Sequence, residues 1–257
     1  MHEILRNLPP HSRVLDLGSK NGSFDAERYG LSVFRLDLEA PGKRSQHFVA
    51  ADAAHLPFAA ETFACVVANH SLEHIVNLPE ALTEIRRVLQ PDGSVYVAVP
   101  DASTFSDRVY RWLAHGGGHV NAFVSSEATG AMIAEAIGLP LNAIRPLLSS
   151  FSFANRHNEL WSRRIALLGW GDERFLAGLS YGTRVLDRAL GTRWSHYGWA
   201  FYFGAIAEPI PVEIWTNVCV RCGSATPASL LEFHSRALLP NVYRCPSCGA
   251  KNLFTRD

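Results

Sequence analysis

Five short apolar runs are separated by more polar segments over the first hundred residues. They occupy residues 13–17, 33–38, 48–52, 63–69 and 94–100. Each run is almost continuously apolar, which is typical of parallel strands that are covered on both faces of a sheet. The pattern therefore predicts a parallel sheet whose strands alternate with helices.

Helical patterns lie between and after these strands. The clearest one begins at Asn77, which suits the N-cap, has Pro79 in its first turn and Glu80 three residues after the cap, and ends at residues 91–93. Further helices are expected at 125–138, 158–168 and 172–190, the last closed by Gly191, and further strands within 141–153 and at 196–206. This order predicts a doubly wound α/β fold.

Composition and charge narrow the function classes. The 257 residues are 47% hydrophobic and 19% charged, as in a globular protein, and 24 basic residues balance 24 acidic ones. No overall positive field therefore draws the chain to nucleic acid or to an anionic membrane. No apolar run approaches the roughly 20 residues of a membrane helix, and the N-terminus lacks the pattern of a secretory signal. We expect a cytoplasmic protein without a membrane partner.

Acidic residues stand at the ends of the second and third predicted strands. These are Asp37 and Asp52, whereas the first strand contains Asp16 and leads into a loop with Gly18 and Gly22. In an open α/β sheet, ligands bind beyond the carboxyl ends of the strands. The loop lacks the G-x-G-x-x-G dinucleotide pattern, so its glycines alone identify no cofactor. The alternative for the acidic residues is that they cap turns.

The ordered set of motifs is more specific than any one of them. The set is Asp16-Leu-Gly-Ser-Lys-Asn-Gly22, Leu36-Asp37-Leu38, Ala51-Asp52-Ala-Ala-His-Leu-Pro-Phe58, Asn69-His-Ser-Leu-Glu-His-Ile75 and Glu84-Ile-Arg-Arg-Val-Leu-Gln-Pro-Asp-Gly93. Over about residues 10–140 it resembles the class I S-adenosylmethionine-dependent methyltransferases. The resemblance implies a Rossmann-like, mostly parallel sheet in a methyltransferase domain over residues 1–208, with a helical insertion at about 155–191.

The resemblance also implies a site for S-adenosylmethionine. Asp37 would accept hydrogen bonds from both ribose hydroxyls, Asp52 would accept one from the adenine amino group, and Asp16 would orient the loop or the cofactor's amino group. The implied cofactor residues are Asp16, Gly18, Ser19, Lys20, Gly22, Asp37, Leu38, Asp52, Ala53, Asn69 and His70. Lys20 in the loop and Ala64 in the fourth strand depart from the family pattern, which leaves the strength of cofactor binding open.

Four of the five cysteines form two C-x-x-C pairs near the C-terminus. Cys219 and Cys222 are separated by 22 residues from Cys245 and Cys248, and a glycine follows each pair. Four thiolates at this spacing favour a structural Zn²⁺ site, with iron or a redox dithiol as alternatives. We predict a zinc-ribbon-like module over residues 212–257. It either fastens the C-terminus to the catalytic domain or recruits a partner.

Candidate residues for the acceptor side follow the fifth predicted strand. Transfer to a hydroxyl requires removal of a proton, which a histidine facing the acceptor can accept. His119, in the run Gly116-Gly-Gly-His-Val-Asn-Ala-Phe123, is the predicted general base, and the alternative is that it is structural and anchors the glycines. Asp101, Tyr110 and His157 are further candidates, and His74 is predicted to be structural.

These patterns together predict a methyltransferase that uses S-adenosylmethionine and carries a structural zinc ion. The expected acceptor is a small molecule or a glycan, methylated on a hydroxyl. The alternatives are an RNA or protein methyltransferase whose zinc module recruits the macromolecule, and a degenerate scaffold that binds the cofactor without turnover. Nucleic acid is not favoured, because the segment from Val212 onward has only two more basic than acidic residues before metal is bound.

Overall fold

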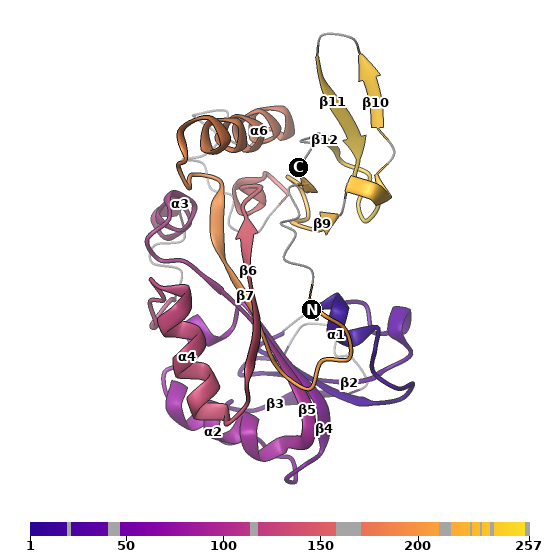
Figure 1. Cartoon of the computed structure of the whole chain (residues 1–257), viewed down its shortest axis with the longest axis vertical. Coiled ribbons are helices and arrows are strands. Elements are labelled where there is room, and N and C mark those ends of the chain that lie inside the picture. The colour runs from indigo at the N-terminus through magenta and orange to yellow at the C-terminus, as the bar shows by residue number, and fades with distance from the viewer. Residues whose placement is uncertain are drawn as a thin grey trace. The chain divides into compact units, whose positions relative to one another are not determined.

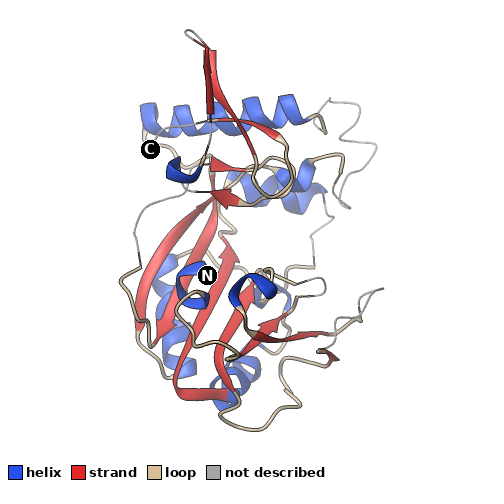
Figure 2. Ribbon diagram, turned by 90° about the vertical axis from the view of Figure 1, so that its right-hand side faces the viewer, coloured by secondary structure: helices blue, strands red, loops and turns tan. Residues whose placement is uncertain are grey.

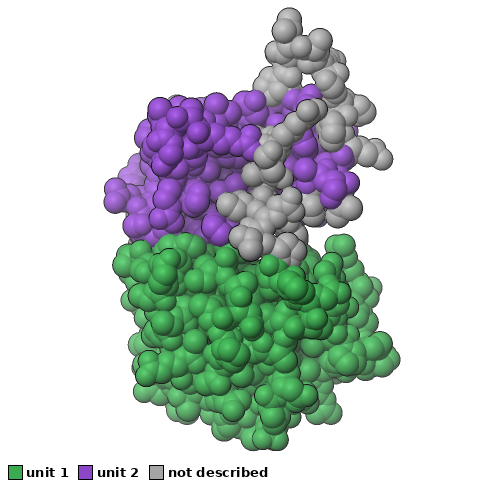
Figure 3. Space-filling view, in the orientation of Figure 1, with its two compact units in different colours: residues 1–100, 119–145, 199–212 green, residues 101–118, 146–198, 213–257 purple. Residues whose placement is uncertain are grey.

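The computed structural model of the chain describes residues 1–19, 22–40, 47–113, 118–157, 171–210, 217–226, 228–231, 233–236 and 239–254. It divides into two compact units (Figure 3). The first comprises residues 1–100, 119–145 and 199–212, and the second comprises residues 101–118, 146–198 and 213–257. The cysteine-rich C-terminal segment therefore belongs to the same unit as two segments from the middle of the chain.

Helices and strands follow one another in the order shown by the labels of Figure 1. Up to the fifth strand they are α1 (His2–Leu5), β1 (Arg13–Leu17), η1 (Glu27–Tyr29), β2 (Ser32–Asp37), β3 (Phe48–Ala50), β4 (Phe63–Asn69), η2 (Leu72–His74), α2 (Leu78–Val88) and β5 (Leu89–Pro100). After it come α3 (Phe105–Leu113), α4 (Ser126–Ile137), β6 (Leu141–Leu148), η3 (Ser152–Ala154), α6 (Glu173–Leu190) and β7 (His196–Gly204). The C-terminal segment adds β8 (Asn217–Val218), β9 (Ala225–Thr226), η4 (Ala228–Leu230), β10 (Phe233–Arg236), β11 (Leu239–Arg244) and β12 (Lys251–Leu253).

Seven strands form one sheet in the order β3-β2-β1-β4-β5-β7-β6. Figure 2 shows strands in red and helices in blue. Strand β1 pairs in parallel with β2 and with β4, and the pairs β2–β3 and β4–β5 are also parallel. Strand order reverses at β1, where chains of this type bind ligands. The doubly wound, mostly parallel sheet expected from the sequence is confirmed.

The hydrophobic core of the first unit explains why the strand sequences are almost continuously apolar. Val66, Val95 and Val97 are completely buried, and Ile85 of α2 and Ile133 of α4 belong to the same cluster. Helices α2 and α4 also contact each other. A strand covered by helices has no solvent-facing side, so polar residues are confined to its ends.

The bounds of the expected elements agree closely with the structure, with one clear difference after α2, whereas α3 was not among the expected helices. The helix begins after Asn77, although this residue makes no side-chain capping hydrogen bond, and it ends at Val88 instead of at residues 91–93. Strand β5 begins immediately, at Leu89. The pairing of β4 with β5 is irregular between Phe63 and Cys65, so the strand accommodates the turn-forming residues that were expected to separate it from the helix.

The second unit combines helices with the Cys module, which we define as residues 217–254. Val220 of this module packs in one cluster with Phe151, with Leu113 of α3 and with Leu176 of α6. The side-chain amide of Asn155, which is completely buried, donates a 2.9 Å hydrogen bond to the carbonyl oxygen of Val220. Packing and hydrogen bonding thus join the Cys module to the helical segments of its unit.

Two further expectations concern the helix after residue 157 and membrane-spanning helices. The helix expected at 158–168 lies outside the described residues. Among the helices that the structure does describe, none has both the length and the hydropathy needed to cross a membrane.

Candidate functional site

The carboxyl ends of β1, β2 and β3 are joined by backbone hydrogen bonds. The amide of Gly18 donates to the carbonyl oxygen of Leu36 at 2.7 Å, and the amide of Ala51 donates to that of Asp37 at 3.1 Å. The loop after β1 and the acidic ends of β2 and β3 consequently lie side by side. We call Asp16, Gly18, Gly22, Asp37 and Asp52 the strand-end site.

Gly18 and Gly22 occupy positions that a side chain would disrupt. Their φ angles are +69° and +90°, in the left-handed region. A Cβ on Gly18 would lie 2.4 Å from Cβ of Ser71, and one on Gly22 would lie 2.5 Å from a guanidinium nitrogen of Arg35. The glycines therefore let the loop approach its own neighbours in the fold, in addition to leaving the backbone accessible.

Asp16 is a completely buried carboxylate at the carboxyl end of β1. Its Oδ2 accepts a 2.8 Å hydrogen bond from the amide of Ser23, which holds the far side of the loop. Its Oδ1 is buried and has no hydrogen-bond partner in the described part of the chain. Burial raises the pKa of Asp16, although hydrogen bonds from Ser23 and Ser19 oppose the shift. A buried acceptor of this kind is suited to a cationic ligand group.

Asp37 and Asp52 each make one hydrogen bond to their own turn. Oδ1 of Asp37 accepts from the amide of Glu39 at 3.3 Å, and Oδ1 of Asp52 accepts from the amide of Ala54 at 2.9 Å. The turn capping that the sequence offered as an alternative is therefore present. It occupies one oxygen of each carboxylate, so capping and ligand binding are compatible.

His70 follows β4 in a conformation that is unusual for a residue with a side chain. Its φ is +54°, and its amide donates to the carbonyl oxygen of Ala98 at 2.9 Å. Its Nδ1 lies 3.7 Å from Oε1 of Glu73, whose side chain is only 2% exposed. Burial opposes ionisation of Glu73, but hydrogen bonding and the charge of His70 outweigh it and lower the pKa of this carboxyl.

The remaining implied cofactor residues differ in their surroundings. Ser19 is buried and donates from Oγ to the carbonyl oxygen of Asp16 at 2.8 Å, whereas Leu38 is 71% exposed. Ala53 is buried and Asn69, at the end of β4, is half-buried. Lys20 lies outside the described residues.

Ala64 lies at the opposite end of its strand from the strand-end site. It is the second residue of β4, which runs from Phe63 to Asn69. Five residues of extended chain span about 16 Å. The departure from the family pattern at Ala64 is therefore remote from the residues expected to hold the cofactor.

His119, the predicted base, lies beside η2. Its ring is 4.9 Å from that of His74, centroid to centroid, in an edge-to-face arrangement. The next two residues fasten this loop, because the amides of Val120 and Asn121 donate to the carbonyl oxygen of Glu73 at 2.8 and 3.1 Å. Sequence reasoning assigned no role to Glu73. The signal available was an acidic residue directly before His74 in a segment that follows a buried strand.

The other acceptor-side candidates lie in the second unit and have structural partners there. Oδ1 of Asp101 accepts from the amide and the hydroxyl of Ser103 at 2.9 and 2.6 Å, and its Oδ2 lies 3.6 Å from a guanidinium nitrogen of Arg193. His157 is half exposed, with Nε2 at 3.9 Å from Oε1 of Glu173. Oδ2 of Asp101 is buried and has no hydrogen-bond partner among the described residues, so the role of this carboxylate on the acceptor side stays a prediction.

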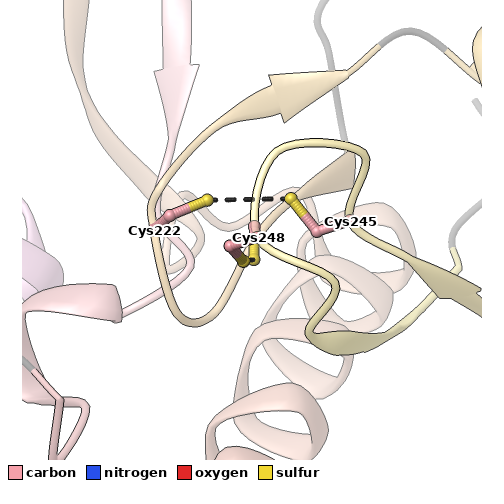
Figure 4. A group of neighbouring side chains, drawn as sticks. Cys222, Cys245 and Cys248 are labelled. Carbon is pink, nitrogen blue, oxygen red and sulfur yellow. Dashed lines mark hydrogen bonds between the residues drawn. The ribbon is translucent and has the colours of Figure 1, made fainter.

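The four cysteines of the Cys module converge, as Figure 4 shows for three of them. Sγ of Cys219 lies 3.6 Å from Sγ of Cys248, Sγ of Cys222 lies 3.7 Å from Sγ of Cys245, and all four sulfurs are within 4.8 Å of one another. Around a tetrahedral metal with bonds of about 2.3 Å, sulfurs are separated by about 3.8 Å. The two separations of 3.6 and 3.7 Å are close to this value, so the cluster has the donor atoms and two of the spacings of a tetrahedral thiolate site.

The two C-x-x-C turns have the same backbone geometry. Gly223 and Gly249 both have a φ of +71°. Their amides donate to the carbonyl oxygens of Cys219 and Cys245, each at 2.9 Å. Cys219 Sγ also accepts hydrogen bonds from the backbone amide of Arg221 at 3.4 Å and from the side-chain amide of Asn252 at 3.5 Å. Such bonds to sulfur stabilise a thiolate.

The sequence relationship agrees with the geometry at the strand ends. A family model for a methyltransferase domain matches residues 1–141, which is more than half of the chain. The chain belongs to this methyltransferase-domain family. The matched segment contains every residue of the strand-end site and also Glu73, His74 and His119, whereas the Cys module of this methyltransferase-domain protein lies outside it.

Curated relatives of the methyltransferase domain have names that specify different substrates. Malonyl-[acyl-carrier protein] O-methyltransferase of Methylococcus capsulatus is 30% identical over 132 residues, which cover 46% of this chain and 48% of that protein. Demethylmenaquinone methyltransferase of Renibacterium salmoninarum is 36% identical over 106 residues, covering 37% of this chain and 44% of that protein. The chain thus spans about half the length of the curated relatives it matches, or less.

Solved structures show the same fold at low identity. A methyltransferase structure from Bacillus halodurans is 19% identical with a TM-score of 0.51, over 78% of this chain and 95% of that one. A methyltransferase structure from Anabaena variabilis is 16% identical with a TM-score of 0.52, over 78% of this chain and 93% of that one. These likenesses extend beyond the matched family segment and concern the fold alone.

Proposed function

We propose that this protein transfers the methyl group of S-adenosylmethionine to an acceptor molecule. The observation that carries the proposal is that backbone hydrogen bonds join the ends of β1, β2 and β3, which carry Asp16, Asp37 and Asp52, at the point where strand order reverses. Membership of the methyltransferase-domain family supports it. S-adenosylmethionine supplies an electrophilic methyl group on a sulfonium, so the chain's own task is to align donor and acceptor.

The residues of the strand-end site fit the functional groups of this cofactor. Oδ1 of Asp16 is buried without a partner in the described residues and suits the amino group of the methionine portion. Asp37 ends β2 with one oxygen available for the ribose hydroxyls, as an acidic residue does in dinucleotide-binding folds. Asp52, beside the buried Ala53, has the same capacity for the adenine amino group. Asn69 and His70 complete the proposed cofactor set at the end of β4.

The proposed acceptor is a small molecule or a glycan that is methylated on a hydroxyl. The relatives support a small or carrier-bound acceptor, because their names specify an acyl-carrier malonyl group and demethylmenaquinone. For a hydroxyl acceptor, the base predicted from the sequence is His119. This role stays a prediction, and the surroundings of His119 suggest a different one, which the next subsection develops.

For the Cys module we propose a structural zinc ion held by Cys219, Cys222, Cys245 and Cys248. The sulfur separations of 3.6 and 3.7 Å support tetrahedral coordination. The buried position of Val220 among residues of α3 and α6 supports a structural role in the second unit.

A groove in the second unit supports a second candidate function, in which the acceptor is a macromolecule. It has a volume of about 470 Å³ and lies between α6 and the Cys module. Arg174, Arg244 and Lys251 line it, together with Arg221, which is paired with Glu173. A basic groove of this kind would suit the phosphates of RNA or an acidic protein.

Titration calorimetry with S-adenosylmethionine tests the proposed function. Asp37→Ala removes the proposed ribose acceptor and should abolish or strongly weaken binding, because a hydrogen bond to a charged group contributes about 1.5–3 kcal/mol, equivalent to about 10- to 150-fold in affinity. Asp92→Ala is the matched control, since it removes an exposed carboxylate from β5 in the same unit. It should leave the affinity unchanged.

Two outcomes would contradict the proposal. Folded wild-type protein that binds no S-adenosylmethionine, with and without candidate acceptors, would show that the site has lost its cofactor. Binding that Asp37→Ala leaves unchanged would place the cofactor elsewhere. Cofactor binding without turnover on any acceptor of the proposed classes would instead favour the degenerate scaffold.

A further inference from the structure

Three side chains with metal-binding donor atoms meet beside the strand-end site. One nitrogen each of His74 and His119 and one carboxylate oxygen of Glu73 lie within 4.8 Å of one another. All three residues belong to the first unit. They come from two segments, η2 and the loop after residue 118, which the backbone hydrogen bonds from Val120 and Asn121 to Glu73 hold together.

Glu73 is the least expected member of this cluster. Its side chain is only 2% exposed, and Oε2 has no hydrogen-bond partner among the described residues. Oε1 faces His70 at 3.7 Å, which leaves Oε2 as the oxygen with an unmet demand. A buried carboxylate oxygen without a partner is costly, so its presence calls for a ligand that the described residues do not provide.

The donor set matches a first-row divalent cation. Two imidazoles and one carboxylate bind such ions and leave further coordination positions open. Bonds of about 2.1 Å allow donor atoms to be up to about 4.2 Å apart, so a small rotation is enough to close the cluster around an ion. His74 is exposed and His119 is half-buried, which gives the ion an entry path from solvent.

We propose that Glu73, His74 and His119 bind a divalent metal ion next to the cofactor site. The proximity follows from Ser71, one residue before η2, whose Cβ lies within 2.4 Å of the position that a Cβ on Gly18 would occupy. The open coordination positions would face water or an oxygen of the acceptor, and this second role rests on the proposed function. A histidine bound to metal is not free to act as a base, so the proposal replaces the predicted role of His119.

The test is a titration of the whole chain with Mn²⁺, followed by the electron paramagnetic resonance signal of the free ion. One equivalent of Zn²⁺ is added first, because thiolates prefer zinc whereas carboxylate and imidazole ligands also accept manganese. The wild-type protein should bind about one Mn²⁺ per chain. Glu73→Gln and His119→Gln should each weaken this binding by about tenfold or more. Loss of a residue that merely supports a ligand already weakens metal binding by about tenfold, and loss of a ligand should cost at least as much.

A matched control distinguishes binding at the proposed site from nonspecific binding of the ion to a surface histidine. His55→Ala removes an exposed imidazole outside the cluster in the same unit and should bind Mn²⁺ like the wild type. Circular dichroism establishes that each variant is folded, and the two isosteric variants provide independent tests if one of them fails to fold. No binding by the wild type, or unchanged binding by a folded Glu73→Gln or His119→Gln variant, would overturn the proposal. Neither S-adenosylmethionine nor an acceptor is present, so this outcome is independent of the proposed methyl transfer.

Discussion

Asp16 shows how a single residue couples burial to ligand binding. Its carboxylate is completely buried in the sheet, and burial raises its pKa against the opposing hydrogen bonds from Ser23 and Ser19. The nearby positive charge of Arg35 also opposes the shift without cancelling it. The unliganded site therefore disfavours the very charge that a cationic amino group would require.

This coupling predicts that the affinity for S-adenosylmethionine depends on pH. The cofactor's amino group stabilises ionised Asp16, so binding releases a proton when the raised pKa leaves the carboxyl protonated, and the affinity should fall as the pH decreases. The fall should begin at a higher pH than an ordinary aspartate would cause. Calorimetry between about pH 5 and pH 8 measures the effect, and Asp16→Asn should bind more weakly with a flatter pH profile. An identical profile in that variant would exclude Asp16 as its source.

Residue-scale prediction from the sequence succeeded unevenly. The positions of Asp37 and Asp52 at neighbouring strand ends follow from the apolar runs that precede them. The burial of Glu73 does not, because it depends on the loop after residue 118 folding back onto η2. A charge that is buried by a segment more than forty residues away has no local signal in the sequence.

Helix α6 illustrates an element whose ends are specified by its own residues. Asp172 accepts a 2.8 Å hydrogen bond from the amide of Arg174 at the N-terminus, and Gly191 closes the C-terminus in the left-handed conformation. Asp187 in the last turn fastens the segment that leads into β7, by accepting from Thr192 Oγ1 and from the amide and hydroxyl of Ser195, at 2.6 to 2.8 Å. Local capping sets the length of the helix, and Asp187 sets how the chain leaves it.

Asp187→Ala should destabilise the second unit more than Asp172→Ala. The first change leaves the buried Ser195 without acceptors and should cost about 2–3 kcal/mol, whereas loss of the N-cap costs about 1 kcal/mol. Burial opposes ionisation of Asp187, but the bonds from Ser195 and Thr192 outweigh it and lower its pKa. Its contribution should therefore persist above the ordinary aspartate pKa and be lost as the pH falls through the lowered value. Urea denaturation measures both variants, and equal effects would contradict the ranking.

At the scale of the whole molecule, the chain is organised into two units that its linear order conceals. The second unit is assembled from residues 101–118, 146–198 and 213–257. The Cys module packs there through Val220 and through the hydrogen bond from Asn155. A metal in the Cys module should consequently stabilise helices that are distant from it in the sequence.

Removal of this metal should loosen the second unit selectively. A chelator, or Cys245→Ser, should increase hydrogen exchange in the Cys module and in α6, while strands β1, β4 and β5 of the first unit keep their protection. Cys65→Ala is the control, because Cys65 is a buried residue of β4 and should leave the zinc content at about one ion per chain. Increased exchange confined to the Cys module would contradict the proposed coupling to α6.

The sequence by itself determined the parallel sheet, the helix that leads into β5, the acidic strand ends and the two C-x-x-C motifs. These features depend on short-range patterns, since apolar runs, capping residues and C-x-x-C turns act over a few neighbouring residues. Only the tertiary structure decided that Glu73 is buried beside His74 and His119, that Ala64 is remote from the strand ends, and that Val220 packs on α6. Those relations come from long-range packing, in which the energy of a contact depends on segments that are far apart along the chain.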